Sequence, residues 1–159
     1  MACPSLSIAR HVSQELSPKC RDRFIECLIV NTLLRGVAKR KDFIASAPGL
    51  WAPTTILMSP TMRCNLTCTG CYAGEYPAGK DLEPEVLQRI VDEGTEMGVY
   101  LYTLLGGEPF CYDGLFDLAA NNQGCYFQVF TNGTLIDDEV VIVASADELA
   151  CRPPASSAK

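Results

Sequence analysis

The alternation of short apolar runs with helical segments from residue 54 onward constrains the fold of this chain more than any other feature. Runs that suit buried strands occupy residues 54–59, 99–105 and 125–131. Between the first two runs, a segment with helical apolar spacing begins at Pro84, a residue favoured in first helical turns, and can end at Gly98. Strand–helix alternation of this kind predicts an α/β fold with a parallel sheet and right-handed crossovers.

Two more helices complete the predicted alternation. One is expected at residues 115–120, and the other from Asp137 or Asp138, which could cap its first turn, to about Leu149. Together these segments predict about three β/α units.

The two ends of the chain differ from this central region. Residues 1–50 are predicted to form an N-terminal helical extension, residues 51–150 the α/β core, and residues 151–159 a disordered tail of low apolar content. Within the extension, one apolar helical stripe is expected to pack against the core. This stripe consists of Phe24, Cys27, Leu28, Leu34 and Val37.

Composition and charge exclude several classes of protein. The 159 residues carry a formal net charge of −6, which argues against a nucleic-acid-binding surface because phosphates are neutralised by clustered lysine and arginine. The most apolar stretch, residues 24–38, is interrupted by Glu26, Asn31 and Arg35, so it is too polar to span a bilayer. The first residues also lack the pattern of a secretory signal. We therefore expect a cytoplasmic protein without a membrane partner.

Nine cysteines are many for a chain of this size, and three of them share one short loop. The odd count and the missing signal argue against an extracellular disulfide framework. Cys64, Cys68 and Cys71 are spaced so that one loop can wrap around one metal centre. Thiolates suit iron–sulfur clusters, zinc and copper(I). Because a four-iron cluster held wholly by protein takes four cysteines, three would leave one iron open to a ligand.

Two other metal sites remain open as alternatives. A zinc site would combine the three cysteines with a distant cysteine or with the sole histidine, His11. A ferredoxin-like electron carrier would need a fourth cysteine nearby, and Cys111 is the nearest downstream candidate. The alternative function is therefore a non-enzymatic iron–sulfur or zinc-binding protein.

Two more motifs follow the second and third predicted strands. Gly-Gly-Glu-Pro occupies residues 106–109, and Thr-Asn-Gly occupies residues 131–133. Each motif alone predicts only a turn. However, the carboxyl ends of parallel strands share one edge of the sheet, where ligands bind, so the cysteine loop and both motifs are expected to meet there. The two glycines would let the backbone approach a ligand closely.

In combination, the three motifs resemble the radical SAM superfamily, whose signature is Cys-x3-Cys-x2-Cys after the first strand of a barrel. The resemblance implies that Cys64, Cys68 and Cys71 hold a [4Fe–4S] cluster and that S-adenosylmethionine chelates its fourth iron. Reductive cleavage of that cofactor would yield a 5′-deoxyadenosyl radical that abstracts hydrogen from a substrate. The implied fold is a partial parallel (β/α) barrel of radical SAM type.

The same resemblance implies a set of cofactor-binding residues and partners. Glu108 would provide a negative partner for the amino group of S-adenosylmethionine, and Tyr72 would cover the cofactor, since Gly70 stands where the family often has an aromatic residue. An electron donor such as a flavodoxin or ferredoxin is implied, as is a substrate that the sequence does not identify. The implied cofactor-binding residues are Tyr72, Gly106, Gly107, Glu108, Pro109, Thr131 and Asn132.

The resemblance covers about residues 54–140. Family members build six β/α units, and their later strands, which contact ribose and adenine, have no counterpart here. The change from Asp-Asp-Glu-Val at residues 137–140 to a Pro/Ser/Ala tail resembles a truncated or frame-shifted reading frame. We therefore expect the 159-residue chain to have little or no turnover by itself.

Overall fold

The computed structural model describes residues 18–76 and 79–136, which form one long helix followed by two β/α units and a third strand. All three strands are parallel and lie in the order β1-β2-β3. The strands are β1 (Thr55–Met58), β2 (Leu101–Leu104) and β3 (Tyr126–Val129). The predicted α/β fold with a parallel sheet and an N-terminal helical segment is therefore confirmed.

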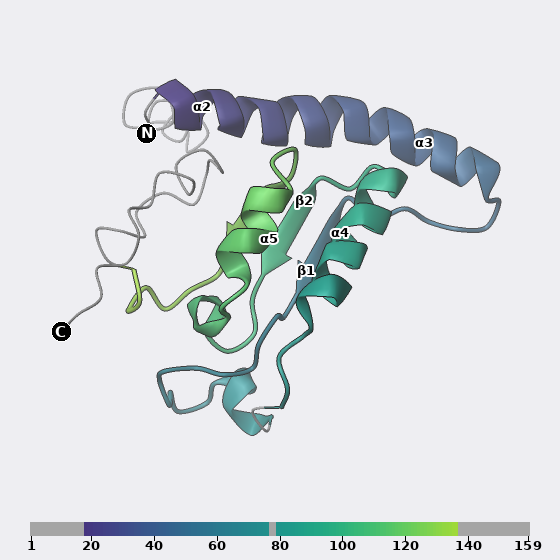
Figure 1. Ribbon diagram of the computed structural model, residues 1–159. Helices are drawn as coiled ribbons and strands as arrows, with labels where there is room; N and C mark the ends of the chain where they lie inside the picture. The colour runs from purple at the N-terminus through teal and green to yellow at the C-terminus, as the bar shows by residue number, and fades with distance from the viewer. Residues whose placement is uncertain (1–17, 77–78, 137–159) are drawn as a thin grey trace, which may run out of the picture.

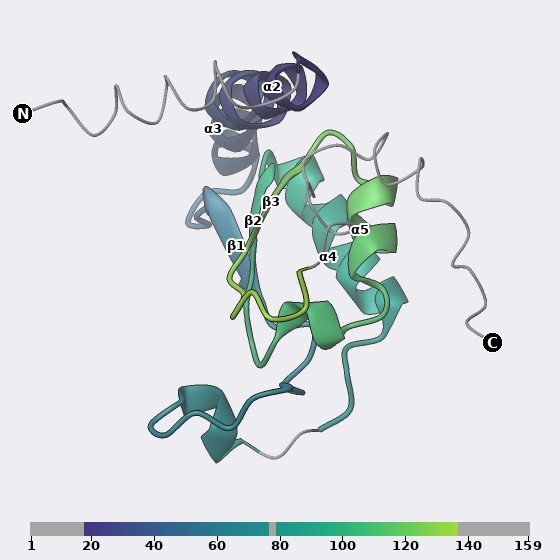
Figure 2. The ribbon, with the colours of Figure 1, turned by 90° about the vertical axis from the view of Figure 1, so that its left-hand side faces the viewer.

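Helices cover one face of the sheet. Figures 1 and 2 both place α4 (Pro84–Met97) and α5 (Leu115–Asn121) on the same side of the strands. Helix α4 begins and ends as predicted, with Pro84 in its first turn and Gly98 after its last. Gly98 has a left-handed φ of 92°, which favours glycine. Two short 3₁₀ turns, η2 (Tyr72–Glu75) and η3 (Pro109–Cys111), lie in the loops that follow β1 and β2.

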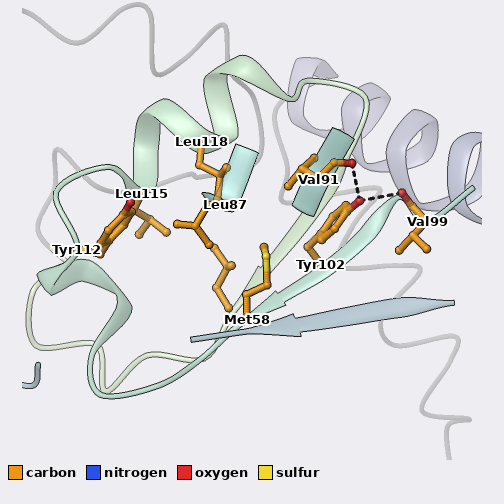
Figure 3. Packing of buried hydrophobic residues seen from close by; sticks show 9 residues of the cluster. Met58, Leu87, Val91, Val99, Tyr102, Tyr112, Leu115 and Leu118 are labelled. Carbon is orange, nitrogen blue, oxygen red and sulfur yellow. Dashed lines mark hydrogen bonds between the residues drawn. The ribbon is translucent and has the colours of Figure 1, made fainter. Parts of the chain in front are cut away.

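The hydrophobic core lies between the sheet and these two helices (Figure 3). Leu87 and Val91 of α4 are fully buried against Tyr102 of β2. The Tyr102 hydroxyl lies 3.0 Å from the Val91 carbonyl and 3.1 Å from the Val99 carbonyl, so the buried phenol has hydrogen-bond acceptors at hand. The other buried members of the cluster are Met58, Val99, Leu104, Tyr112, Leu115 and Leu118.

A long N-terminal helix crosses the amino ends of the strands (Figures 1 and 2). It consists of α2 (Pro18–Phe24), a π-helical stretch η1 (Ile25–Arg35) and α3 (Gly36–Ser46). The Thr32 hydroxyl donates to the Cys27 carbonyl at 2.8 Å, five residues back, which fits the wider π-helical turn. None of the helices within the described ranges is long and apolar enough to cross a membrane.

Polar side chains attach this helix to the core. The Asn31 amide donates to the Gly124 carbonyl at 2.9 Å, just before β3, and Arg40 donates to the Gly98 carbonyl at 2.6 Å, just before β2. The predicted apolar stripe is wrong in part, because Cys27 is buried whereas Leu34 and Val37 are exposed. The inward face of this helix therefore carries polar donors for the carbonyls of Gly98 and Gly124.

Three sequence predictions fall outside the described residues. These are the first part of the N-terminal extension, the helix from Asp137 or Asp138 to Leu149, and the disordered tail at residues 151–159. The division into an extension, a core and a tail therefore stays a prediction.

Candidate functional site

The three predicted motifs follow the carboxyl ends of the three strands, at the edge of the sheet opposite the N-terminal helix (Figures 1 and 2). β1 leads into the cysteine loop, β2 into Gly-Gly-Glu-Pro at residues 106–109, and β3 into Thr-Asn-Gly at residues 131–133. Hydrogen bonds join the three loops directly.

The Gly-Gly-Glu-Pro loop packs backbone against backbone on the segment that enters the cysteine loop. The Gly107 amide donates to the Thr61 carbonyl at 3.1 Å, and the Glu108 amide donates to the Arg63 carbonyl at 2.8 Å. A Cβ atom at Gly106, where φ is 125°, would lie 2.3 Å from the Thr61 carbonyl oxygen, and one at Gly107 would lie 2.2 Å from that of Arg63. Both glycines are therefore needed for contact between two loops of the protein itself.

Glu108 joins the end of β2 to the end of β3. Its side chain is fully buried. One carboxylate oxygen accepts from the Thr131 hydroxyl at 2.7 Å and the Phe110 amide at 3.1 Å, and the other accepts from the Asn132 amide at 2.8 Å. Three donors satisfy this buried charge, as burial of a carboxylate requires. Its oxygens are thus engaged by protein groups, and the contact of Glu108 with the cofactor amino group, which the family resemblance implies, stays a prediction.

Tyr72 and Asn132 tie the cysteine loop to the other two loops. The Tyr72 hydroxyl donates to the Gly106 carbonyl at 3.1 Å. The Asn132 side-chain amide donates to the Asn65 side-chain oxygen at 3.0 Å, and Asn65 in turn donates to the Thr134 hydroxyl at 2.7 Å. Asn65 was missed by the sequence analysis, although it directly follows Cys64, because its partners lie near the end of β3.

The three clustered cysteines line one hollow of about 460 Å³. All three are free thiols; Cys64 and Cys68 are exposed, and Cys71 is half-buried. The Cys64 sulfur accepts from the Leu66 amide at 3.4 Å and from the Asn132 side-chain amide at 3.9 Å. Across residues 18–76 and 79–136, however, no three Cys, His, Asp or Glu side chains come close enough together to hold a metal ion. The three thiols therefore line the same hollow but do not lie close enough to one another to bind one metal ion.

The two candidates for an additional ligand differ in where they lie. Cys111 is half-buried beside the cysteine loop, where its backbone carbonyl accepts from Arg63, the residue before Cys64. Burial raises the pKa of the Cys111 thiol, and the nearby Glu108 and Cys64 raise it further. His11, the proposed zinc ligand, lies outside the described residues.

The sequence model of the radical SAM superfamily matches residues 58–147, more than half of the chain. The chain belongs to the radical SAM superfamily. Members of this family typically bind a [4Fe–4S] cluster and S-adenosylmethionine and react through a radical mechanism. The prediction of the family is thus confirmed.

Two relatives give the scale of this similarity. A probable GTP 3′,8-cyclase from Methanopyrus kandleri is 32% identical over 94 residues, which cover 58% of this chain and 31% of that protein. An AdoMet-dependent heme synthase from Methanosarcina barkeri is 33% identical over 95 residues, which cover 57% of this chain and 27% of that one. This radical SAM chain therefore aligns with less than a third of the length of either relative.

A solved structure supports the fold. The crystal structure of Streptococcus suis SuiB bound to the precursor peptide SuiA matches with a TM-score of 0.53 and 23% identity. The match covers 76% of this radical SAM chain and 27% of SuiB. At that identity the likeness shows the fold alone.

Proposed function

We propose that Cys64, Cys68 and Cys71 hold a [4Fe–4S] cluster, and that S-adenosylmethionine binds beside it for reductive cleavage to a 5′-deoxyadenosyl radical. The observation that carries this proposal is that three free thiols line one hollow at the carboxyl edge of a parallel sheet. Three soft donors fit a cluster with one open iron. Since the thiols are not gathered in advance, we infer that the loop closes around the cluster as it binds.

When bound, the cluster supplies the electron that cleaves the sulfonium of S-adenosylmethionine. The protein groups around it have separate tasks. The three thiolates bind iron, and the amides of Leu66 and Asn132 donate to the Cys64 sulfur, which stabilises its negative charge. Tyr72 connects the cysteine loop to Gly106 and so keeps both loops at one wall of the site.

The Gly-Gly-Glu-Pro backbone is the part of residues 106–109 that we assign to the amino-acid end of S-adenosylmethionine. The Gly106 carbonyl accepts from the Tyr72 hydroxyl of the cysteine loop and has a second lone pair for an ammonium group. The Glu108 carboxylate fixes this loop to the end of β3 through its hydrogen bonds to Thr131 and Asn132. Thr131 and Asn132 thus serve the site as connectors between β2 and β3.

The activity of a complete protein, its substrate and its electron donor are further parts of the proposal. We propose a flavodoxin or ferredoxin as the reductant, because the cluster needs a one-electron donor. The substrate is not assigned.

Anaerobic reconstitution with iron and sulfide tests the proposed function. The expected result is about four irons with labile sulfide per chain and a cluster spectrum that changes on addition of S-adenosylmethionine. Cys68→Ala should lose the iron, whereas Cys125→Ala, which changes a thiol packed against the hydrophobic core, should keep it. Methionine and 5′-deoxyadenosine report the cleavage itself. One zinc per chain, or a spectrum indifferent to S-adenosylmethionine, would contradict the proposal.

The position of Cys111 favours one second candidate, an electron-transfer cluster held by four cysteines. Its backbone carbonyl accepts from Arg63, which directly precedes Cys64. Cys111→Ala separates the two functions. The radical SAM function predicts that this variant keeps its iron and its response to S-adenosylmethionine, whereas a four-cysteine carrier would lose iron.

A further inference from the structure

One arginine fastens the base of the cysteine loop. Arg63 directly precedes Cys64, and Asp81 follows Cys71 by ten residues, so the two residues stand at either end of the loop. Arg63 Nη2 lies 2.6 Å from Asp81 Oδ2, and Arg63 Nε lies 3.1 Å from the same oxygen and 3.2 Å from Oδ1. Arg63 Nη2 also donates to the Cys111 carbonyl at 2.5 Å. The guanidinium thus connects both ends of the loop to the segment that follows residues 106–109.

The backbone around Arg63 is fixed as well as its side chain. The Arg63 amide donates to the Thr61 hydroxyl at 2.9 Å, and its carbonyl accepts from the Glu108 amide at 2.8 Å. Thr61 is almost fully buried. The Arg63 guanidinium, with a smaller contribution from Thr61, lowers the pKa of the Asp81 carboxyl. Asp81 is therefore paired with a residue whose backbone is itself held on both sides.

This ion pair differs from the others that the described residues form. The remaining three pairs are 3.6 Å or longer, and each joins residues within the helices. Arg89 and Glu93, one turn apart on α4, are representative at 3.7 Å with both side chains about two-thirds exposed. The forked contact between Arg63 and Asp81 is the geometry in which a partly exposed pair contributes most.

We propose that Arg63 and Asp81 form a latch that holds the two ends of the cysteine loop together and so keeps the three thiols near one another for the cluster. This inference rests on the proposed function. Both residues are positioning residues, because the cysteine sulfurs would bind iron and these two side chains would not. The latch leaves the middle of the loop free to close around the cluster while its base stays in place.

The test compares Arg63→Gln and Asp81→Asn with wild type and with Arg89→Gln, a matched arginine change on the surface of α4. In the metal-free protein, chymotrypsin cleavage after Tyr72 and Tyr76 measures how often the loop opens. We expect cleavage about fivefold faster in both latch variants and unchanged in the control. After reconstitution, iron loss to a chelator should accelerate by a similar factor. The charge-swapped double variant Arg63→Asp with Asp81→Arg should recover part of the protection.

The outcomes separate the latch from the proposed function. If both latch variants are cleaved and lose iron at the wild-type rate, the latch is refuted even though wild type carries its cluster. If wild type takes up no iron, the proposed function fails, and the cleavage rates of the metal-free proteins still decide whether Arg63 and Asp81 restrain the loop. Equal unfolding midpoints in urea confirm that a variant is folded, and Asp81→Asn serves if Arg63→Gln does not fold.

Discussion

Replacing Glu108 by alanine would remove a fully buried carboxylate that accepts hydrogen bonds from the amides of Phe110 and Asn132 and from the Thr131 hydroxyl. A hydrogen bond to a charged group contributes about 1.5–3 kcal/mol, so three would contribute roughly 5–9 kcal/mol if they were independent. Phe110 and Thr131 are only half-buried and Asn132 is exposed, so the freed donors regain water. We therefore expect Glu108→Ala to lower the free energy of unfolding by about 3–5 kcal/mol.

Urea unfolding followed by circular dichroism measures this loss. Glu108→Gln keeps the volume but turns an amide group toward protein donors, and it should lose about 2–3 kcal/mol. Glu93→Ala, at an exposed helix position, is the control and should change stability by less than about 0.5 kcal/mol. A loss below about 1 kcal/mol for Glu108→Ala would refute the reasoning, because such a value is too small for a buried clamp between β2 and β3.

Three further predictions concern other parts of the molecule. Gly107→Ala would place its Cβ 2.2 Å from the Arg63 carbonyl oxygen, so we expect the free energy of unfolding in urea to fall by about 2–4 kcal/mol and iron uptake to be lost. Gly74→Ala, whose Cβ would meet open space, should behave as wild type. Burial raises the pKa of the Cys125 thiol from 9.0 to about 12, so its neutral form favours the folded state. This contribution to the free energy of unfolding should be fully present below pH 9 and should fall by about 1.4 kcal/mol per pH unit between pH 9 and 12, so Cys125→Ala should reduce the alkaline slope by that amount. Asn31→Ala leaves the Gly124 carbonyl without its donor and should lower stability by about 1–3 kcal/mol without changing iron uptake.

Each of these has a contradicting result. Normal iron uptake by Gly107→Ala would show that the two loops can separate without harm. If the free energy of unfolding falls equally steeply with alkaline pH in wild type and in Cys125→Ala, other groups cause the fall. Loss of iron from Asn31→Ala would show that the two ends of the sheet are coupled.

Local sequence signals were enough to predict the elements of the core. Pro84 and Gly98 delimit α4 because each has a backbone preference that acts within its own turn. The alternation of segments then determined the parallel sheet, and the parallel sheet brought the three motifs to one edge. The strands are shorter than the apolar runs that predicted them, because pairing extends only over the four residues that have partners on the neighbouring strand.

The contacts that organise the candidate site could not be predicted in the same way. Two of the three hydrogen-bond partners of Glu108 lie 23 and 24 residues later in the chain, and the partner of Arg63, Asp81, lies 18 residues later. Neither spacing has a local signature, because these distances are determined by how the loops return to the sheet. The same holds for the N-terminal helix, where Asn31 and Arg40 bind carbonyl groups of the core although no local pattern marks them.

The N-terminal helix and the cysteine loop lie at opposite ends of the same three strands, each four residues long. A four-residue strand spans about 13 Å, so a substitution at Asn31 or Arg40 acts at a distance from the thiols. Stability and chemistry can therefore vary separately in this chain, as they do on the two faces of β/α barrels. For an evolving lineage, the helix is a place to compensate for destabilising changes at the cysteine edge. For an engineer, it is the place to add a fusion partner or a stabilising substitution and leave the thiols untouched.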